Sequence, residues 1–140
     1  MHEPIFLTLA QVLELHTNGL ASHGGQAGIR EPGLVESALA SARNTFWYGH
    51  GGLFDIAAAY AFHLAESQAF IDGNKRVAIS AAITFLHVNG IIMFPDVAAF
   101  HQAMIAIANH QLDKRGLAEL MLRKHLEFCV LHGIASRFQR

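Results

Sequence analysis

The seven residues Phe70–Arg76, which read FIDGNKR, bring a carboxylate, a glycine, an amide and two cations into one short stretch. A hydrophobic stretch ends just before them, and another begins at Val77. Lys75 and Arg76 would therefore lie in the first turn of a helix, where the helix macrodipole is positive and cations are disfavoured. Two cations in this position indicate that an anion is meant to bind there.

The chemistry of these residues favours a nucleoside triphosphate over a bare anion. Gly73 permits a left-handed backbone and the close approach of a ligand, and the free N–H groups of the helix that follows form a natural phosphate site. Lys75 adds a point charge, and Arg76 adds a bidentate fork. Asp72 is placed to hold Mg²⁺ shared with phosphate oxygens. The alternative is that Asp72 and Asn74 only cap the helix and that both cations are solvated.

Length and composition predict one soluble domain spanning 1–140. The chain is 52% hydrophobic and 15% charged, with a mean hydropathy of +0.29, which argues against disorder. A formal net charge of -1 provides no general attraction for nucleic acid. The most apolar stretch, Val77–Phe94, is interrupted by polar residues and a glycine, so we expect a buried helix rather than a membrane span. The N-terminus does not resemble a signal peptide, so we expect a cytoplasmic protein.

Capping residues and hydrophobic periodicity predict an all-α domain of about six helices, with at most a short hairpin. The expected helices begin at Leu9, at Glu31-Pro32, at Leu53, at Asn74, after Asp96 and after Asp113. Their expected ends lie at His23-Gly24-Gly25, near Ala42, near Ser67, at Asn89-Gly90, near Ile107 and at His132-Gly133. The helix body Val77–Val88 is apolar almost all round, so we expect a central helix that is buried on every side.

Two segments between the expected helices lack helical periodicity. Residues 44–52, which read NTFWYGHGG, are aromatic residues flanked by glycines, and we predict a loop or a short extended flap. Trp47 and Tyr48 in this segment would either recognise a substrate peptide or pack the segment onto the domain. Residues 91–94 are predicted to form a short extended piece.

Most of the remaining reactive side chains are expected to be structural. Cys129 is the single cysteine, which excludes an internal disulfide, and it is expected to pack as a small hydrophobic residue. The histidines of the last two expected helices have no metal-binding spacing, so we expect them at the surface or at the edge of the core. These are His101, His110, His125 and His132.

The motif and its context resemble the Fic fold, in its death-on-curing toxin branch. That branch carries His-x-Phe-x-Asp-x-Asn-Lys-Arg before an alanine-rich helix that ends in Asn-Gly, and here FIDGNKR is followed by VAISAAITFLHVNG. The stretch LHTNGLASHGGQAGIREPGLVESALA resembles the family's first two helices with their Gly-Gly loop, and NTFWYG takes the place of its target-positioning flap. The matching motif positions are Phe70, Asp72, Asn74, Lys75 and Arg76.

The resemblance implies a toxin that uses ATP and Mg²⁺. Most Fic proteins transfer AMP and have glycine after the motif asparagine, whereas the death-on-curing branch has lysine there, as Lys75 is here. That branch is implied to transfer the γ-phosphoryl group to a Thr or Ser hydroxyl of a translation elongation factor, which stops translation. An antitoxin encoded beside the toxin is implied to silence it in trans, because the chain lacks the inhibitory string Ser/Thr-x-x-x-Glu-Gly/Asn.

The family's site residues carry over position by position. Asp72 is implied to hold Mg²⁺, and Phe70 is implied to anchor the loop in the core. The implied phosphate-binding residues are Gly73, Asn74, Lys75 and Arg76. The implied catalytic positions are Gln68, Asp72, Lys75 and Arg76. The implied flap residues are Thr45, Phe46, Trp47 and Tyr48.

The chain departs from the family at Gln68, where the motif has its general-base histidine. An amide has no accessible basic lone pair, and general-base catalysis contributes roughly 10²–10⁴-fold. A natural variant would then bind nucleotide or a partner with lost or altered catalysis. An enzyme using another base is a second possibility, although His63 is a poor substitute because it lies more than one helical turn away. A deliberate substitution of the histidine is the third possibility. Ala69 argues against it, because many relatives have proline at this position and a deliberate change would normally alter the histidine alone.

The enzymatic activity therefore stays open at this point. The leading hypothesis is an ATP-dependent protein phosphotransferase. The alternatives are a non-catalytic binding module that keeps the fold and the anion site, and an AMP transferase, which Lys75 disfavours.

Overall fold

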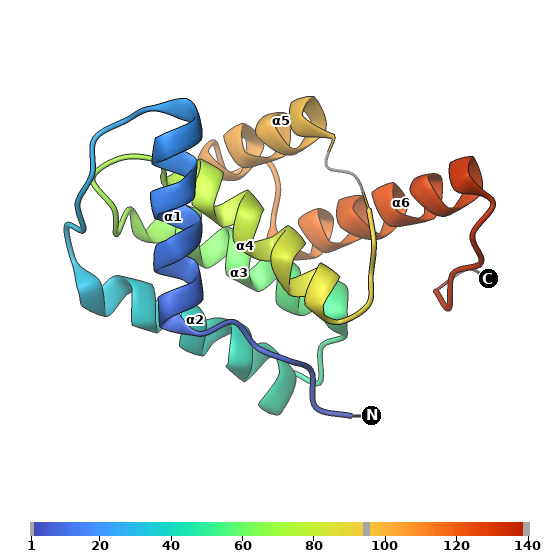
Figure 1. Cartoon of the computed structure of the whole chain (residues 1–140). Coiled ribbons are helices and arrows are strands. Elements are labelled where there is room, and N and C mark those ends of the chain that lie inside the picture. Colours follow the sequence, from blue (N-terminus) through green and yellow to red (C-terminus); the bar gives the residue numbers. More distant parts are fainter. Residues whose placement is uncertain (1, 94–95, 139–140) are drawn as a thin grey trace.

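The computed structural model describes residues 2–93 and 96–138, and this part of the chain is all-α. Within these residues there is no strand, and one isolated antiparallel bridge joins Ile29 to Phe70. The all-α prediction is confirmed, whereas the short hairpin is not found in the described residues. The six helices are α1 (Leu9–His23), α2 (Pro32–Trp47), α3 (Leu53–Ser67), α4 (Asn74–Val88), α5 (Val97–Ala108) and α6 (Lys114–His132) (Figure 1).

The helix ends follow the local signals in the sequence. Thr8 and Gln11 form a complete capping box at the start of α1. Asp96 caps α5 and Asp113 caps α6, each through a backbone N–H in the first turn. Gly133 ends α6 in the left-handed conformation. These boundaries depend on chemistry within a few residues, which is why they were predictable.

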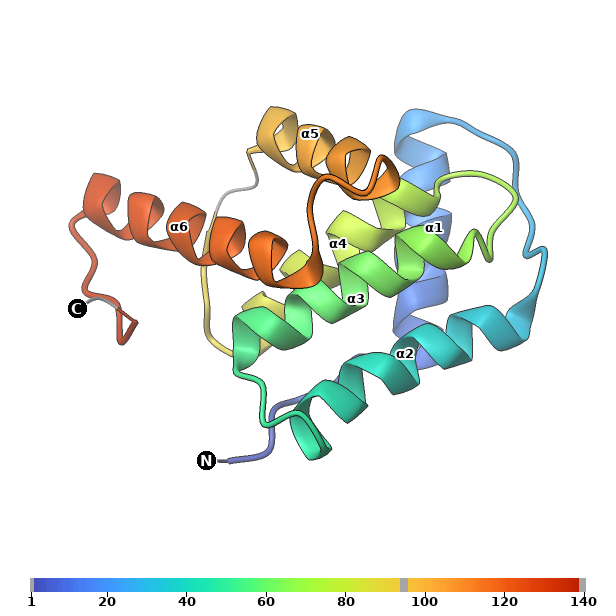
Figure 2. The ribbon, with the colours of Figure 1, turned by 180° about the vertical axis from the view of Figure 1, so that it is seen from behind.

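Helix α3, and not α4, is the central helix of the fold. It packs against α2, α4, α5 and α6 (Figure 2), and every residue from Ile56 to Ala61 is buried. Four of those six residues are alanines, whose small side chains let neighbouring helices approach closely. The prediction that α4 is buried on every side is wrong, because Ile79 and Ser80 are half-buried and Val88 is 41% exposed.

Two further predictions concern the core and residues 91–94. Cys129 is buried, as expected for a small hydrophobic residue. Ile91 and Met93 are buried and Ile92 is exposed, without forming a strand, and Phe94, the last residue of the predicted extended piece, lies outside the described residues. Among the described helices, none is long and apolar enough to cross a bilayer.

The connections at the two ends of α3 lie far apart. Residues 68–73 join α3 to α4 at the end where the α1–α2 connection also lies, and residues 48–52 join α2 to α3 at the opposite end (Figure 1). Fifteen helical residues separate the two connections, which corresponds to about 22 Å. The motif loop and the predicted flap are therefore on different parts of the molecule.

Candidate functional site

The motif loop, defined here as residues 68–73, turns sharply between α3 and α4. Gln68 ends α3 with a left-handed backbone (φ 51°, ψ 37°), and Gly73 precedes α4 with φ 81°. Between them Phe70 is fully buried, which confirms that it anchors the loop in the core. The loop thus folds back on itself and leads directly into the first turn of α4.

His16 of α1 packs against the motif loop and hydrogen-bonds to it. Its ring stacks on Phe70 with the ring centroids 3.9 Å apart and the planes at 17°, and its Nε2 donates to the carbonyl oxygen of Asp72 at 2.7 Å. His16 is itself buried. The sequence analysis did not single out His16, for which the one signal was a polar residue at helical spacing from Val12, Leu13 and Leu20.

Asn74 holds the loop closed and does not cap α4. Its Oδ1 accepts from the N–H of Phe70 at 3.0 Å, and its Nδ2 donates to the carbonyl of the same residue at 2.8 Å. The predicted cap is wrong: Gly73 occupies the N-cap position and no side chain caps the helix. The reason is that the buried backbone N–H and carbonyl of Phe70 each require a hydrogen-bond partner. The Asn74 amide supplies one acceptor and one donor.

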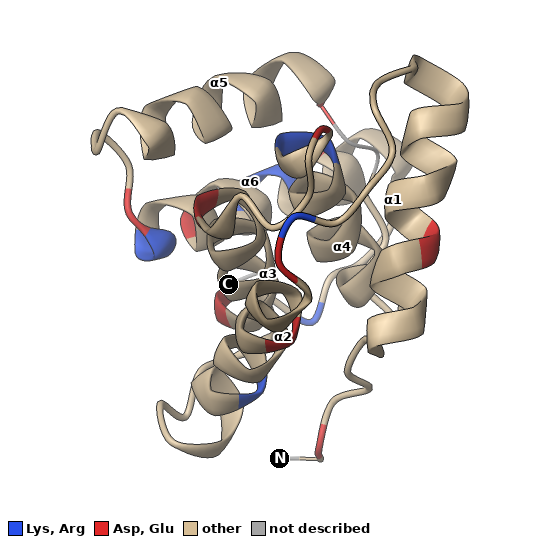
Figure 3. Cartoon of the chain, turned by 90° about the vertical axis from the view of Figure 1, so that its left-hand side faces the viewer, with Lys and Arg blue, Asp and Glu red and all other residues tan. Residues whose placement is uncertain are grey.

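The N-terminus of α4 is open toward solvent. With no side-chain cap, the N–H groups of its first turn remain available to an external acceptor. Lys75 is exposed at this end, and Asp72 is exposed just before it. Figure 3 views the molecule from this side and colours its charged residues. A helix N-terminus with a cation and a carboxylate beside it is suited to an anion that brings a metal ion.

Gly73 is required for this turn, because its φ of 81° lies where a Cβ atom is strained. Replacing Gly73 by alanine is expected to lower the free energy of unfolding by about 1–2 kcal/mol, measured by urea denaturation. Gly33→Ala is the matched control, since Gly33 lies in the first turn of α2, where a Cβ would meet only the Glu31 side chain at an ordinary contact distance of 3.7 Å. That control is expected to be neutral or slightly stabilising. Equal losses in both variants would contradict the strain argument.

Asp72 is kept ionised by its surroundings. The backbone N–H groups of Gln26 (3.1 Å) and Gly73 (2.8 Å) donate to its carboxylate, and they are the main reason why its pKa lies below the ordinary 3.8, with Arg76 lowering it further. Because the unfolded chain binds this proton more tightly, the stabilisation is complete above pH 3.8 and is lost as the pH falls through the folded-state pKa. At neutral pH the group is a carboxylate with lone pairs left for a metal ion.

Arg76 is half-buried, and its side chain reaches the end of α1. Its guanidinium donates to the carbonyls of Gly19 (3.4 Å) and Gly24 (3.3 Å). A cation at a helix C-terminus interacts favourably with the macrodipole, so Arg76 ties α1 to the start of α4. A guanidinium has five N–H donors, and its predicted contact with phosphate stays a prediction.

Residues 24–31, here called the glycine segment, lie along the motif loop. The N–H of Arg30 donates to the carbonyl of Ala69 at 2.7 Å, and the N–H of Ile71 donates to the carbonyl of Gly28 at 3.1 Å. Glycines make this approach possible: a Cβ on Gly25 would lie 2.8 Å from the Asp72 carboxylate. Sequence reasoning treated this segment as a connection between helices, and its glycines were the available signal.

The predicted flap at residues 44–52 is not extended and does not lie near the motif. Thr45, Phe46 and Trp47 belong to the last turn of α2, and Tyr48 is its C-cap. The helix continues because Phe46 packs edge-on against Phe6, with ring centroids 6.1 Å apart. Trp47 and Tyr48 are 51% and 82% exposed. By position, the glycine segment and not residues 44–52 is placed to contact something bound at the motif.

Gln68 is exposed, and its side chain turns back to its own helix, where Nε2 donates to the carbonyl of Ala65 at 2.9 Å. His63, the alternative base considered from the sequence, is engaged elsewhere: its Nε2 accepts from the Lys114 ammonium at 3.1 Å. Burial, and then the charge of Lys114, hold the pKa of His63 below its ordinary 6.5. His63 is therefore tied to the start of α6.

The pairing of His63 with Lys114 makes a testable prediction. Lys114→Met is expected to raise the pKa of His63 because a nearby positive charge is removed, while burial keeps the value below 6.5. The ring proton signals of His63 in an NMR titration measure this. Arg115→Met is the control, because Arg115 pairs with Glu119 instead. An unchanged or lower pKa in Lys114→Met would refute the assignment.

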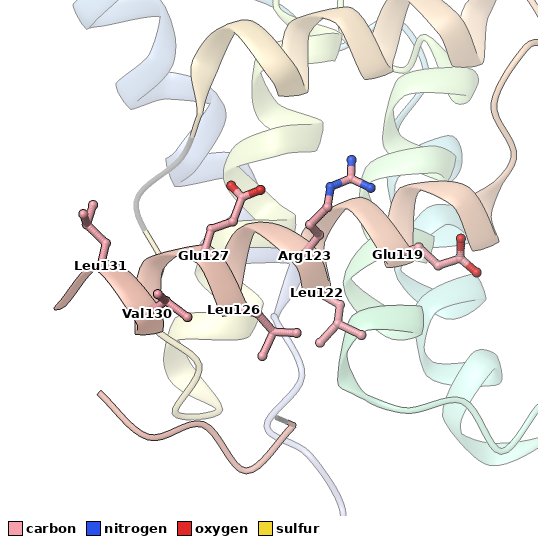
Figure 4. A pocket seen from close by; sticks show the side chains of 7 residues that line it. All are labelled: Glu119, Leu122, Arg123, Leu126, Glu127, Val130 and Leu131. Atoms are coloured by element: carbon pink, nitrogen blue, oxygen red, sulfur yellow. The ribbon is translucent and has the colours of Figure 1, made fainter. Parts of the chain in front are cut away.

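A hollow lies on the outer face of α6, away from the motif (Figure 4). It has a volume of about 670 Å³ and is mostly apolar, with Val130 and Leu131 strongly exposed. None of its lining residues belongs to the motif, the loop or the glycine segment. The lining residues are Glu119, Leu122, Arg123, Leu126, Glu127, Val130 and Leu131.

Comparison with known proteins identifies the family. The profile of the Fic/DOC family matches residues 6–86, which include the motif loop and nearly all of α4. "Toxin Doc" of Mycolicibacterium smegmatis is 42% identical over 83 residues, 57% of this chain and 63% of that protein, so the match spans less than two thirds of that relative. "Protein kinase doc" of Escherichia phage P1 is 26% identical over 114 residues, 81% of this chain and 90% of that protein. The chain belongs to the Fic/DOC family.

Proposed function

We propose that this protein is a death-on-curing-type toxin that transfers the γ-phosphate of ATP to a Thr or Ser hydroxyl of a translation elongation factor. The observation that carries the proposal is the open N-terminus of α4, with Lys75 exposed and Asp72 ionised beside it. The names of the two relatives, a toxin and a protein kinase, support it.

The residues present fit a nucleotide with its metal ion. The uncapped first turn of α4 and the left-handed Gly73 would cradle phosphates through backbone N–H groups, and Lys75 would add charge. Asp72 would hold Mg²⁺ with the lone pairs that Gln26 and Gly73 leave free. When bound, Mg²⁺ neutralises charge on the phosphates. In this proposal Asn74 shapes the loop, because its amide is occupied by Phe70.

Gln68 favours a second candidate function, a binding module without catalysis. The side chain at the position of the general base is an amide that donates a hydrogen bond to the carbonyl of Ala65. An amide does not accept a proton near neutral pH. Such a protein would keep the fold and the anion site and act through a partner.

The proposed partner is an antitoxin supplied in trans. The relative named as a toxin supports this assignment, and the sequence lacks the family's own inhibitory string. A toxin of this kind would act in the cytoplasm, where its elongation-factor target is found.

The test is group transfer from ATP labelled at the α or the γ position. Purified protein and Gln68→His are each incubated with Mg²⁺ and a cytosolic extract, and labelled proteins are separated by electrophoresis. Label from γ alone is the expected result. Label from α would replace the proposal by AMP transfer, and ATP binding without transfer by either protein would establish the binding module.

A further inference from the structure

A cavity beside the motif is lined both by Gln68 and by a histidine that is distant in the sequence. It has a volume of about 230 Å³ and lies where the end of α3, the start of α4 and the end of α5 meet. Gln68 and Lys75 line it from the motif, and His110 lines it from the connection after α5. The other lining residues are Ala65, Glu66, Met104, Ile107 and Ala108. Thus 42 residues of chain separate two side chains that share one small cavity.

His110 has an unusual backbone conformation for a residue with a side chain. Its φ is 58°, in the left-handed region, and it follows α5 in a Schellman motif: its N–H donates to the carbonyl of Ile107 and the N–H of Gln111 donates to that of Ala106. Glycine usually occupies this position because it is unstrained there. Of the three non-glycine residues with positive φ in the described chain, Gln68 and His110 line this cavity and His50 does not. Strained residues of this kind cluster at functional sites.

Among the side chains in the cavity, an imidazole is the one suited to accept a proton at neutral pH. Gln68 has no basic lone pair. Lysine side chains are ordinarily protonated and carboxylates are ordinarily weak bases near pH 7, whereas imidazole has an ordinary pKa of about 6.5, close to the operating pH that general-base catalysis favours.

We propose that His110 is the general base that the motif lacks. This rests on the proposed function. As the target hydroxyl oxygen bonds the γ-phosphorus of ATP, the bond from that phosphorus to the bridging oxygen breaks and ADP leaves with the electron pair. The hydroxyl proton passes to the free ring nitrogen of His110. Gln68, with its carboxamide at the mouth of the same cavity, orients the hydroxyl.

Charged groups from three helices line the two hollows that His110 borders. Glu66 comes from α3 and Lys75 from α4, both in the shared cavity. Asp113, the N-cap of α6, lines a neighbouring hollow that His110 also borders.

The experiment measures γ-phosphoryl transfer by the wild-type protein and by His110→Gln, Gln68→His and the double variant. His110→Gln is expected to lower the rate roughly 10²–10⁴-fold, and the double variant is expected to recover it because histidine returns to the motif. ATP affinity by calorimetry should be the same in all four proteins. The wild-type rate should fall on acidification, and His110→Gln should lose this dependence.

Two further variants separate catalysis from folding. His110→Gly keeps the Schellman motif without strain, so its melting temperature should not fall although transfer is lost. His101→Gln makes the same substitution at an exposed histidine of α5 outside the cavity and should keep the rate within a few fold. Full activity in His110→Gln would overturn the role of His110, as would activity in Gln68→His with none in the wild-type protein. No transfer by any variant would overturn the proposed function itself, and the role of His110 with it.

Discussion

Phe70→Ala is expected to destabilise the protein by about 3–5 kcal/mol, the usual cost of removing a buried aromatic ring. Phe70 is fully buried and stacks on His16, so the substitution removes apolar burial and leaves a cavity under the motif loop. The free energy of unfolding from urea denaturation, followed by circular dichroism, measures the loss. The midpoint should fall while the denaturant slope stays the same.

Ile71→Ala is the matched control for this prediction. Ile71 is the next residue in the same loop but is 41% exposed, so its truncation should cost well under half as much. If both variants lost the same stability, the loop would be held by its backbone hydrogen bonds and not by the Phe70 anchor. Because the buried ring holds in place the loop whose backbone binds Asn74 at Phe70, ATP affinity should fall in Phe70→Ala and not in Ile71→Ala.

The second large effect is expected at Asp72. Asp72→Asn should remove the dependence of ATP binding on Mg²⁺, weakening the apparent Mg²⁺ affinity by roughly 100-fold or more, since even an outer-shell partner of a metal typically contributes 10–100-fold. Binding of ATP without Mg²⁺ should be unchanged or tighter, because a negative charge near the phosphates is removed. Calorimetric titration of ATP with and without Mg²⁺ measures both quantities.

Asp55→Asn is the control, because Asp55 is also an exposed carboxylate that accepts a backbone N–H, that of Gly52, at 3.0 Å. It lies in the first turn of α3, at the end away from the motif. It should leave both titrations unchanged. An Asp72→Asn protein that still responds to Mg²⁺ as the wild type does would remove Asp72 from the metal site. The circular dichroism spectrum of each variant establishes that the helices are retained.

The sequence by itself determined most of the helix ends and the grouping of the motif residues. Capping at Thr8, Asp96 and Asp113 and the stop at Gly133 depend on groups a few residues away, so the pattern of residue types was sufficient to predict them. The grouping of Asp72, Gly73 and Lys75 was equally local. A turn that enters a helix presents consecutive residues to the same region of space, and the prediction of an open anion site at that turn needed no knowledge of the fold.

Only the tertiary structure decided which distant residues surround that turn. His16, the glycine segment and the carbonyls that bind Arg76 all come from the first 31 residues, and His110 comes from beyond α5. Residues 44–52, chosen as the flap from their composition and the family resemblance, lie at the other end of α3 because that helix separates them from the motif (Figure 1). The predicted helix from Leu53 to near Ser67 already implied this separation. Helix periodicity says which face of a helix is buried but not which neighbour covers it. That choice is made by packing across the whole core, where the alanines of α3 set how closely each helix approaches.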